Sequence, residues 1–514
     1  MKKPLKKEKQ MITKQNFVSA SFDVDWKMIN WSKCQKNIQR LQARIVQAVK
    51  LGRWNKVKAL QRILTRSFSA KALAVKRVTA NKGKWTPGVD GQVWQTTSEK
   101  SHGITTLEGR GYKPAPLRRV YIPKSNGQKR PLGIPTIKDR AMQALYLMGL
   151  EPVAETKGDQ HSYGFRRCRS AADAMSQIYK TLAGRNRAQW ILEGDIKGCF
   201  DEINHEWLMK AIPIEKPILH KWLKSGFMEY KKLFPTVAGT PQGGIISPVL
   251  ANMTLDGLET IIENHFGKKG SKTRKGCGVY IIRYADDFIV TGKTKEILET
   301  KVKPIIEQFL SERGLVLSAE KTTIAHIEQG FDFLGQNTRK YGSKLIIKPS
   351  KKSVVRLLER VRDLVRKNRA TTQTDLITML NPQIRGWTYY HRHVCSRKTF
   401  EKIDHEIFKI LWQWAKRRHP NKGKEWVKKK YFELRKSQQW GFNTVVKNKN
   451  GLEKLELFKS TSVPIRRRIK IRGNANPFDK EWYPYFEERE QKGTTIGVSS
   501  MKRDYQEAVG RISW

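Results

Sequence analysis

Three aspartates stand where they could bind metal ions and support phosphoryl transfer. Asp286 and Asp287 are adjacent in the stretch IIRYADDFIV, between two runs of apolar and β-branched residues that predict the strands of a hairpin. Taken alone, the pair is equally consistent with a solvated turn, because Asp favours turns, and with a magnesium site. A calcium loop of the EF-hand type is excluded because its spaced series of ligands is absent.

A third carboxylate, Asp195, favours the metal site. It follows the apolar run of WILEGDIKGCF, where we expect a strand to end and a helix to begin. It could merely cap that helix. However, a strand-end Asp that faces a hairpin-tip Asp is the arrangement of a two-metal site. Cations roughly 4 Å apart in such a site clamp the attacking and leaving oxygens of an in-line transfer and neutralise the clustered carboxylates.

The charge balance predicts a polyanionic partner. Lys and Arg number 101 against 47 acidic residues, which gives a net charge of +54. Such a surplus destabilises a compact fold by self-repulsion unless a polyanion neutralises it. The basic residues are spread along the whole chain rather than collected on one amphipathic helix, so nucleic acid is favoured over a membrane surface.

Membrane insertion and secretion are disfavoured. No apolar run approaches the roughly 20 residues that span a bilayer, and the basic start MKKPLKKEKQ is followed by no apolar signal region. The 5 cysteines are few and scattered, which is typical of a reducing compartment. We therefore expect a cytoplasmic location.

The pattern of apolar residues divides the chain into regions. Residues 31–80 show two amphipathic stripes of helical spacing, and the turn-rich WTPGVDG (85–91) follows them. From about 110 to 345 short strand patterns alternate with helical ones, as in an α/β or α+β catalytic body. A predominantly helical region follows Pro349, and Lys- and Arg-rich stretches with aromatics begin near residue 425.

These motifs together resemble one family. YADD (284–287), preceded by GDIKGCFDEI (194–203) and GTPQGGIISPVLAN (239–252), is similar to the palm of reverse transcriptases. Their order and spacing resemble the group II intron-encoded reverse transcriptase/maturases. The resemblance covers nearly the whole chain and also includes LRRVYIPKSNGQKRPLGIPTIKDRAMQ (117–143), HSYGFRRCRS (161–170), LSAEKT (317–322), GFDFLGQ (330–336), NPQIRGWTYYHRHV (381–394) and RIKIRGNANPFDKEWYPYF (468–486).

The resemblance implies an α/β (α+β) right-hand polymerase fold. Its parts would be a helical basic N-terminal extension (1–92), the fingers and palm of the reverse transcriptase (93–345), a helical thumb or maturase X domain (346–425) and a basic C-terminal DNA-binding region (426–514). Many relatives end in a zinc-supported HNH endonuclease. The last residues here hold no cysteine or histidine, so we expect no HNH domain, although a truncated chain would explain this equally well.

The resemblance also assigns the metal site. It implies two Mg²⁺ ions, with Mn²⁺ as a possible substitute, held by Asp195, Asp286 and Asp287. Asp287 would be the less direct ligand. The backbone carbonyl of Ile196 would complete one coordination sphere.

Five further residues match substrate-binding positions of the family. Lys124 and Arg130 would hold the incoming triphosphate, and Gln242 would brace nucleotide and template. Phe200 would clash with a ribose 2′-hydroxyl. Lys321 would protonate pyrophosphate. Without the motifs, Phe200 could equally be a core residue and the three basic side chains could be solvated surface residues.

The resemblance implies a polymerase that is also a splicing cofactor. It would copy intron RNA into cDNA and promote splicing and reverse splicing into DNA (retrohoming). Its partners would be a group II intron RNA in a lariat ribonucleoprotein, an RNA template with a DNA primer, target DNA and dNTPs, with no membrane. The location would be the bacterial cytoplasm, at the nucleoid when the protein is on DNA. The alternatives are a splicing-only maturase with a disused polymerase site and a reverse transcriptase recruited to defence or repair.

Overall fold

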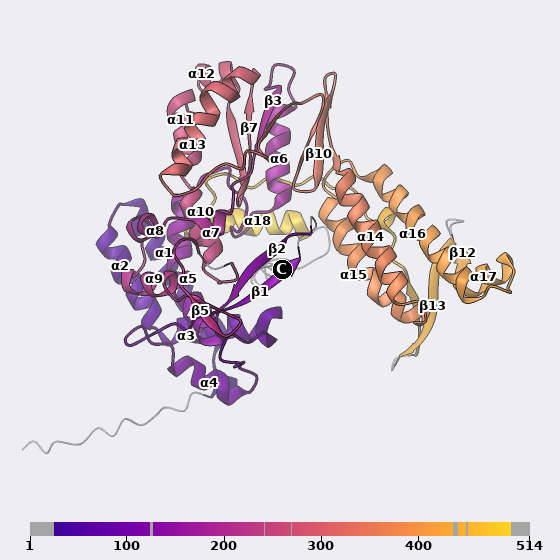
Figure 1. Cartoon of the computed structure of the whole chain (residues 1–514), viewed down its shortest axis with the longest axis horizontal. Helices are drawn as coiled ribbons and strands as arrows, with labels where there is room; N and C mark the ends of the chain where they lie inside the picture. The colour runs from indigo at the N-terminus through magenta and orange to yellow at the C-terminus, as the bar shows by residue number, and fades with distance from the viewer. Residues whose placement is uncertain are drawn as a thin grey trace, which may run out of the picture.

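The computed structural model describes residues 25–123, 127–240, 242–268, 270–434, 440–448 and 451–494. Figure 1 shows three parts. N-terminal helices and a small sheet lie at the bottom, a second sheet flanked by helices lies at the top, and a helical bundle stands apart to the right. None of the helices in these described stretches is long and apolar enough to cross a membrane.

The expected helical region at 31–80 is confirmed and consists of three helices. They are α1 (Trp31–Lys50), α2 (Trp54–Arg66) and α3 (Phe68–Ala80). Asn30 caps α1 and Ser67 caps α3, each accepting a hydrogen bond from a first-turn backbone N–H. The apolar stripe that contains Ile38, Ile45 and Val49 is buried in the same hydrophobic core as the helix α5 (Ile137–Lys157). The predicted boundary at residue 92 therefore does not separate two cores.

The fingers contain a four-stranded sheet of order β2-β1-β4-β5. Its strands are β1 (Leu117–Pro123), β2 (Lys129–Ile134), β4 (Phe227–Glu229) and β5 (Lys232–Phe234). β1 and β2 are antiparallel, with Ile122 opposite Arg130, whereas β4 joins β1 in parallel. Shorter elements outside this sheet are η1 (Trp26–Met28), η2 (Lys82–Trp85), α4 (Thr97–Thr105), α8 (His205–Ala211) and α9 (Lys216–Leu223).

The palm is an antiparallel sheet of order β6-β7-β3-β8 with both faces covered. Its strands are β3 (Trp190–Gly194), β6 (Tyr280–Tyr284), β7 (Asp287–Gly292) and β8 (Thr323–His326). Leu192, Phe288 and Val290 face one core, and Ile191 and Ile289 face another, which explains the continuous apolar runs.

Helices cover the two palm faces. The first core includes residues of α10 (Ser247–Leu255), α11 (Leu258–Phe266) and α13 (Lys303–Ser311). The second includes α6 (Ala171–Leu182). The remaining palm elements are α7 (Cys199–Glu202), α12 (Lys272–Cys277) and one π-helical turn, η3 (Ile297–Val302).

A small sheet connects the palm to the helical bundle. It contains β9 (Phe331–Phe333), β10 (Gln336–Tyr341) and β11 (Lys344–Pro349). The bundle consists of α14 (Lys351–Lys367), α15 (Gln373–His391) and α16 (Arg397–Arg418) around a third core. Leu357, Leu358 and Val361 of α14 are buried there, as their helical spacing predicts.

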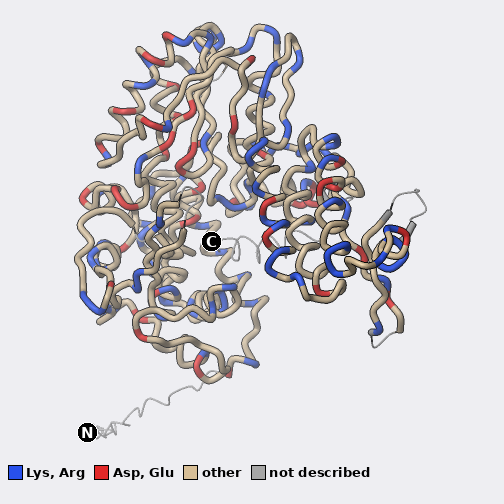
Figure 2. The backbone as a smooth tube through the Cα atoms, turned by 45° about the vertical axis from the view of Figure 1, so that its right-hand side comes forward, with Lys and Arg blue, Asp and Glu red and all other residues tan. Residues whose placement is uncertain are grey.

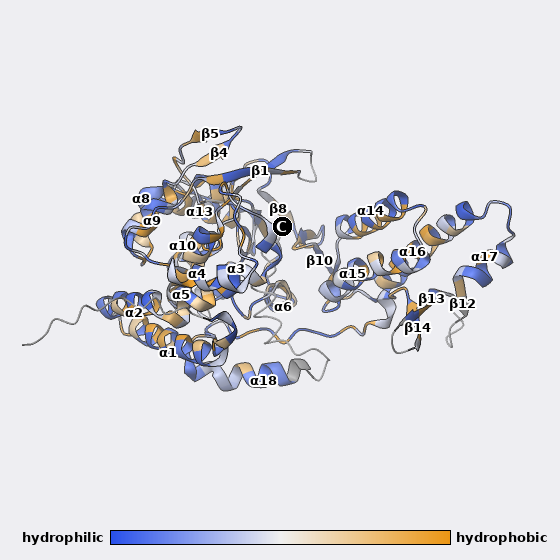
Figure 3. Ribbon diagram, turned by 90° about the horizontal axis from the view of Figure 1, so that it is seen from below, coloured by the Kyte–Doolittle hydropathy of each residue, from blue (hydrophilic) through white to orange (hydrophobic). Residues whose placement is uncertain are grey.

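The region 426–514, predicted as one unit, has two separate packing partners. Its first part packs on the bundle and contains α17 (Lys424–Tyr431), β12 (Phe432–Leu434), β13 (Trp440–Asn448) and β14 (Gly451–Glu456). After η4 (Ser460–Ser462) the chain returns to the palm and the N-terminal helices, through η5 (Lys480–Trp482) to α18 (Tyr483–Thr494). Figure 3 shows this return, with α18 beside α1.

Candidate active site

Asp286 lies in a tight turn of two residues. β6 and β7 pair up to Tyr284 and Asp287, so only Ala285 and Asp286 connect them. Ala285 has φ of 58°, a left-handed conformation that two-residue hairpin turns require and that costs a non-glycine residue roughly 1–2 kcal/mol. Gly164 packs against this turn so closely that a Cβ there would lie 2.3 Å from the Ala285 nitrogen. Close packing of Gly164 therefore holds this turn in place.

Asp195 lies beside this turn because of strand register. β3 pairs with β7, and the last pair is Gly194 with Phe288, so Asp195 comes one residue beyond the pairing, level with Asp287. Gly194 has no room for a side chain, since a Cβ would lie 2.2 Å from the Phe288 ring. The three predicted carboxylates thus meet at one edge of the palm sheet.

The three carboxylates influence one another's pKa values. Desolvation by the surrounding protein, followed by the charges of Asp286 and Asp195, raises the pKa of Asp287 to about 6. Burial also raises the pKa of Asp286, with Asp195 contributing. Carboxylates that repel each other in this way are stabilised by a cation.

Asp287→Asn is expected to stabilise the fold at neutral pH. The folded pKa of about 6 exceeds the ordinary 3.8, so ionisation of Asp287 destabilises the folded chain as pH rises through 6. Asp287 nevertheless has an exposed surface, so solvent screens its charge and we expect only a modest gain, a Tm higher by roughly 1–3 °C at pH 7.5. The gain should vanish below pH 4. Thermal unfolding of both proteins across this range tests the prediction, and equal Tm values at pH 7.5 would contradict it.

The donor set fits Mg²⁺, although no closed cage is present. Among the described residues, no group of three or more His, Cys, Asp or Glu side chains is close enough to hold a metal ion. Mg²⁺ does not require such a cage, since it takes one or two carboxylates and completes its octahedron with water and phosphate oxygens. Reverse transcriptase domains in general use divalent metal ions.

Lys321 contacts one of these carboxylates, that of Asp195. Its Nζ donates to Asp195 Oδ2 at 2.8 Å, and this hydrogen bond raises the Lys321 pKa. The side chain is nevertheless 67% exposed. Ser318 N donates to the Asp195 carbonyl at 2.8 Å, and Ile196 forms an isolated bridge with Leu317, so the loop that carries Lys321 is fixed to the strand end.

Arg130 approaches the site from the fingers. It lies on the exposed end of β2, and its positive charge lowers the Asp286 pKa against the effect of burial. Lys124, the second predicted triphosphate ligand, lies outside the described residues. The side chain of Ile196 is buried, so only its main chain can serve as the predicted ligand.

Phe200 and Gln242 lie on connected segments. Phe200 is half-buried in α7 and contacts Phe165 edge-to-face, with ring centroids 6.3 Å apart. Gln242 Nε2 donates to Asp201 Oδ2 at 3.2 Å, and its carbonyl accepts from Gly133 N at 2.8 Å. The Gln242 loop therefore connects α7 to the fingers sheet.

Sequence reasoning missed two residues at this site. Arg283 is a buried base inside the apolar strand that leads to the turn, and that unusual position was the available signal. Glu193 lies two residues before Asp195, on the same side of β3. Burial, followed by the charge of Asp332, raises the pKa of Glu193 to about 7.

Comparison with known proteins agrees with this geometry. Three family models match: the N-terminal domain of reverse transcriptase over 26–107, reverse transcriptase (RNA-dependent DNA polymerase) over 122–338, and the group II intron maturase-specific domain over 354–432. Protein YkfC of Escherichia coli is 33% identical over 346 residues, 60% of this chain and 88% of that protein. The chain belongs to the group II intron reverse transcriptase/maturase family. This confirms the resemblance, the right-hand polymerase fold and the RNA-directed DNA polymerase class.

Other relatives match over smaller shares. The group II intron-encoded protein LtrA of Lactococcus lactis is 31% identical over 328 residues, which are 52% of this reverse transcriptase and 54% of LtrA. Telomerases of Candida albicans and Candida tropicalis are similar solved structures, both 13% identical, with TM-scores of 0.34 and 0.38. They cover 62% and 63% of this chain, and 65% and 60% of the telomerase chains.

Proposed function

We propose that this reverse transcriptase copies intron RNA into cDNA and also binds its intron RNA to promote splicing and reverse splicing into DNA. The meeting of Asp195, Asp286 and Asp287 at one sheet edge, with Arg130 facing it, is the observation that supports the polymerase role. Bound Mg²⁺, or Mn²⁺ in its place, would polarise the primer 3′-hydroxyl and neutralise the departing pyrophosphate.

The protein's own groups would bind and orient the substrates. The Asp195, Asp286 and Asp287 carboxylates and the Ile196 carbonyl would hold the metal ions. Arg130, with Lys124, would bind the triphosphate, because guanidinium and ammonium groups match phosphate oxygens. Gln242 would brace the nucleotide and template, and Lys321 would give a proton to pyrophosphate.

Phe200 is the proposed ribose gate. Phe200→Val would leave room for a 2′-hydroxyl and raise the preference for rNTP over dNTP, measured as kcat/KM, by about 10–10²-fold. Phe165→Val is the matched control, because it removes the same aromatic contact and leaves Phe200 in place. An unchanged preference in Phe200→Val, or an equal change in both variants, would contradict the gate.

The thumb is the proposed RNA-binding part. α14 buries its apolar face in the thumb core, and Figure 2 shows Lys and Arg along the helices of the bundle. Exposed cations bind phosphates without sequence preference and release counterions, so binding should weaken steeply with salt. The maturase-specific match over 354–432 favours an intron RNA partner over a role in defence or repair.

Three assays on the wild-type protein test the proposal. Extension of a DNA primer on an RNA template, over a Mg²⁺ series and with dNTPs, tests the polymerase. Splicing of the flanking intron RNA at low Mg²⁺, with and without protein, tests the maturase. Incubation of the lariat ribonucleoprotein with target DNA, with intron RNA joined to DNA as the readout, tests reverse splicing. Absence of primer extension at every Mg²⁺ concentration would contradict the polymerase role and favour the splicing-only maturase.

A further inference from the structure

A buried arginine braces the turn that carries Asp286. The Arg283 side chain is 2% exposed, and its Nη1 donates to the Ala285 carbonyl at 3.3 Å and to Asn252 Oδ1 at 3.1 Å. Its Nη2 forms an ion pair with Asp256. One guanidinium therefore joins the catalytic turn to the helix α10 and to the residue that follows it.

The segment 159–164 also packs against this turn and the strand that leads to it. Arg283 N donates to the His161 carbonyl, and Tyr163 N donates to the Arg283 carbonyl, both at 2.9 Å. Asn252 Nδ2 donates to the Gly164 carbonyl at 2.8 Å. Both α10 and this segment therefore hold the turn in place.

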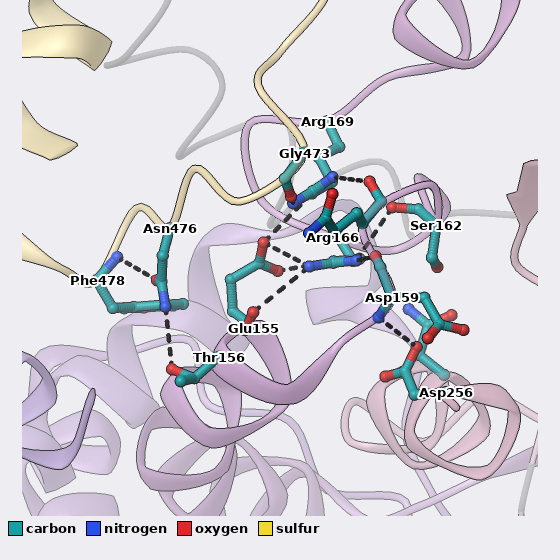
Figure 4. A network of polar contacts seen from close by, with 12 residues as sticks. Glu155, Thr156, Asp159, Ser162, Arg166, Arg169, Asp256, Gly473, Asn476 and Phe478 are labelled. Carbon is teal, nitrogen blue, oxygen red and sulfur yellow. Dashed lines mark hydrogen bonds and ion pairs between the residues drawn. The ribbon is translucent and has the colours of Figure 1, made fainter. Parts of the chain in front are cut away.

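Arg166 fixes the segment to α5. It donates to the carbonyls of Asp159 and Ser162 and forms a two-pronged pair with Glu155, both prongs at 2.8 Å. Figure 4 shows these contacts around the Arg166 guanidinium. The Arg166 and Glu155 side chains are both almost completely buried, so each charge depends on the other to offset the cost of its burial.

Arg169 connects Glu155 to the returning C-terminal chain. Its Nε donates to Glu155 Oε1 at 3.2 Å and its Nη2 to the Gly473 carbonyl at 2.8 Å. A few residues further on, Asn476 Nδ2 donates to Thr156 Oγ1 at 3.0 Å, as Figure 4 also shows. The C-terminal segment therefore supplies partners to a buried polar network that reaches the catalytic turn.

We propose that the C-terminal segment (residues 466–479) is a positioning element of the polymerase site. The C-terminal segment binds Arg169 through the Gly473 carbonyl. Arg169, Glu155 and Arg166 in turn fix the segment 159–164. That segment contacts Arg283 and the turn of Asp286. Networks of buried charges work as a unit, because a missing partner leaves an uncompensated charge. The inference rests on the proposed polymerase function and is separate from the predicted DNA binding.

Arg283→Gln should lower kcat for dNTP incorporation about 10²-fold, as small misplacements of catalytic groups do. The KM for dNTP should change little, and half-maximal activity should require more Mg²⁺. Arg283→Lys, which keeps the charge and loses the planar fork, should recover part of the rate. The assay uses the full chain and a primer on an RNA template without target DNA.

Arg274→Gln is the matched control. Arg274 is equally buried, pairs with Glu263 and donates to the Val279 carbonyl at 3.0 Å, but it lies at the far end of β6 from the turn. It should lose a similar amount of thermal stability and keep kcat within about twofold. Equal losses of kcat in both glutamine variants would overturn the role of Arg283.

A double-mutant cycle tests the connection to the C-terminal segment. Arg169→Gln should lower kcat about tenfold, and its combination with Arg283→Gln should fall less than the product of the two effects, since both act through one support. Independent effects, or an unchanged kcat in Arg169→Gln, would overturn the connection. If Arg283→Gln does not fold, Arg283→Lys takes its place in the cycle. An inactive wild type would instead refute the proposed function.

Discussion

We expect replacement of Asp286 with alanine to abolish primer extension on an RNA template, with a rate at least ~10³-fold lower than that of the wild type. Asp286 is the carboxylate at the tip of the palm hairpin. A carboxylate that holds a catalytic cation contributes several kcal/mol of transition-state stabilisation, which corresponds to a factor of this size. Single-turnover extension at several Mg²⁺ concentrations measures the loss.

Glu320→Ala is the control for Asp286→Ala. It removes an exposed carboxylate from the loop that also carries Lys321 and should extend primers normally. Splicing of the intron RNA at low Mg²⁺ should continue with Asp286→Ala, because RNA binding does not need this carboxylate. Substantial extension by Asp286→Ala would contradict the assignment of the site. Loss of splicing together with extension would contradict the separation of the two functions.

Gly164→Ala should have the second largest effect, although residue 164 makes no contact with substrate in our proposal. The new Cβ would lie 2.3 Å from the Ala285 nitrogen and 2.8 Å from the Tyr284 carbonyl carbon. Because these are backbone atoms, the turn itself must move, and we expect kcat about 10²-fold lower with a loss of roughly 1–3 kcal/mol of stability.

Gly276→Ala provides the matched comparison. A Cβ at Gly276 meets nothing within 4 Å, and the residue lies in α12, so alanine should be neutral or stabilising by up to about 1 kcal/mol. Primer extension and urea unfolding of both variants distinguish a displaced turn from a general effect of the added methyl group. A fully active Gly164→Ala enzyme would show that the turn tolerates displacement.

The local parts of the site could be predicted because their signals are local. Apolar runs on each side of Asp286 and Asp287 specify two strands, and only two residues remain for the turn. The end of the apolar run before Asp195 likewise marks the strand end. The roles of Phe200 and Gln242 came from motif resemblance and stay predictions, as do those of Arg130 and Lys321.

The supporting contacts could not be predicted because they join distant segments. The sequence around Arg283 shows a basic residue inside an apolar strand. No nearby residue in the sequence identifies Asp256 as the partner of this arginine. The division at residue 425 followed a change in composition, whereas Tyr431 and Phe442 pack in the same core as the thumb helices. A basic stretch in a sequence usually indicates a solvated or nucleic-acid-binding segment. The sequence therefore gave no indication that Arg468 contacts the palm.

The packing of α6 also determines when the protein can finish folding during synthesis. Asp173 in α6 is completely buried, and burial alone would raise its pKa, but Arg468 and Arg489 outweigh that effect and lower it. Arg489 is made 316 residues later, a delay of about 15–60 s at typical elongation rates. Until then one face of the palm lacks this partner, so the palm reaches its native state only after residue 489 has been made.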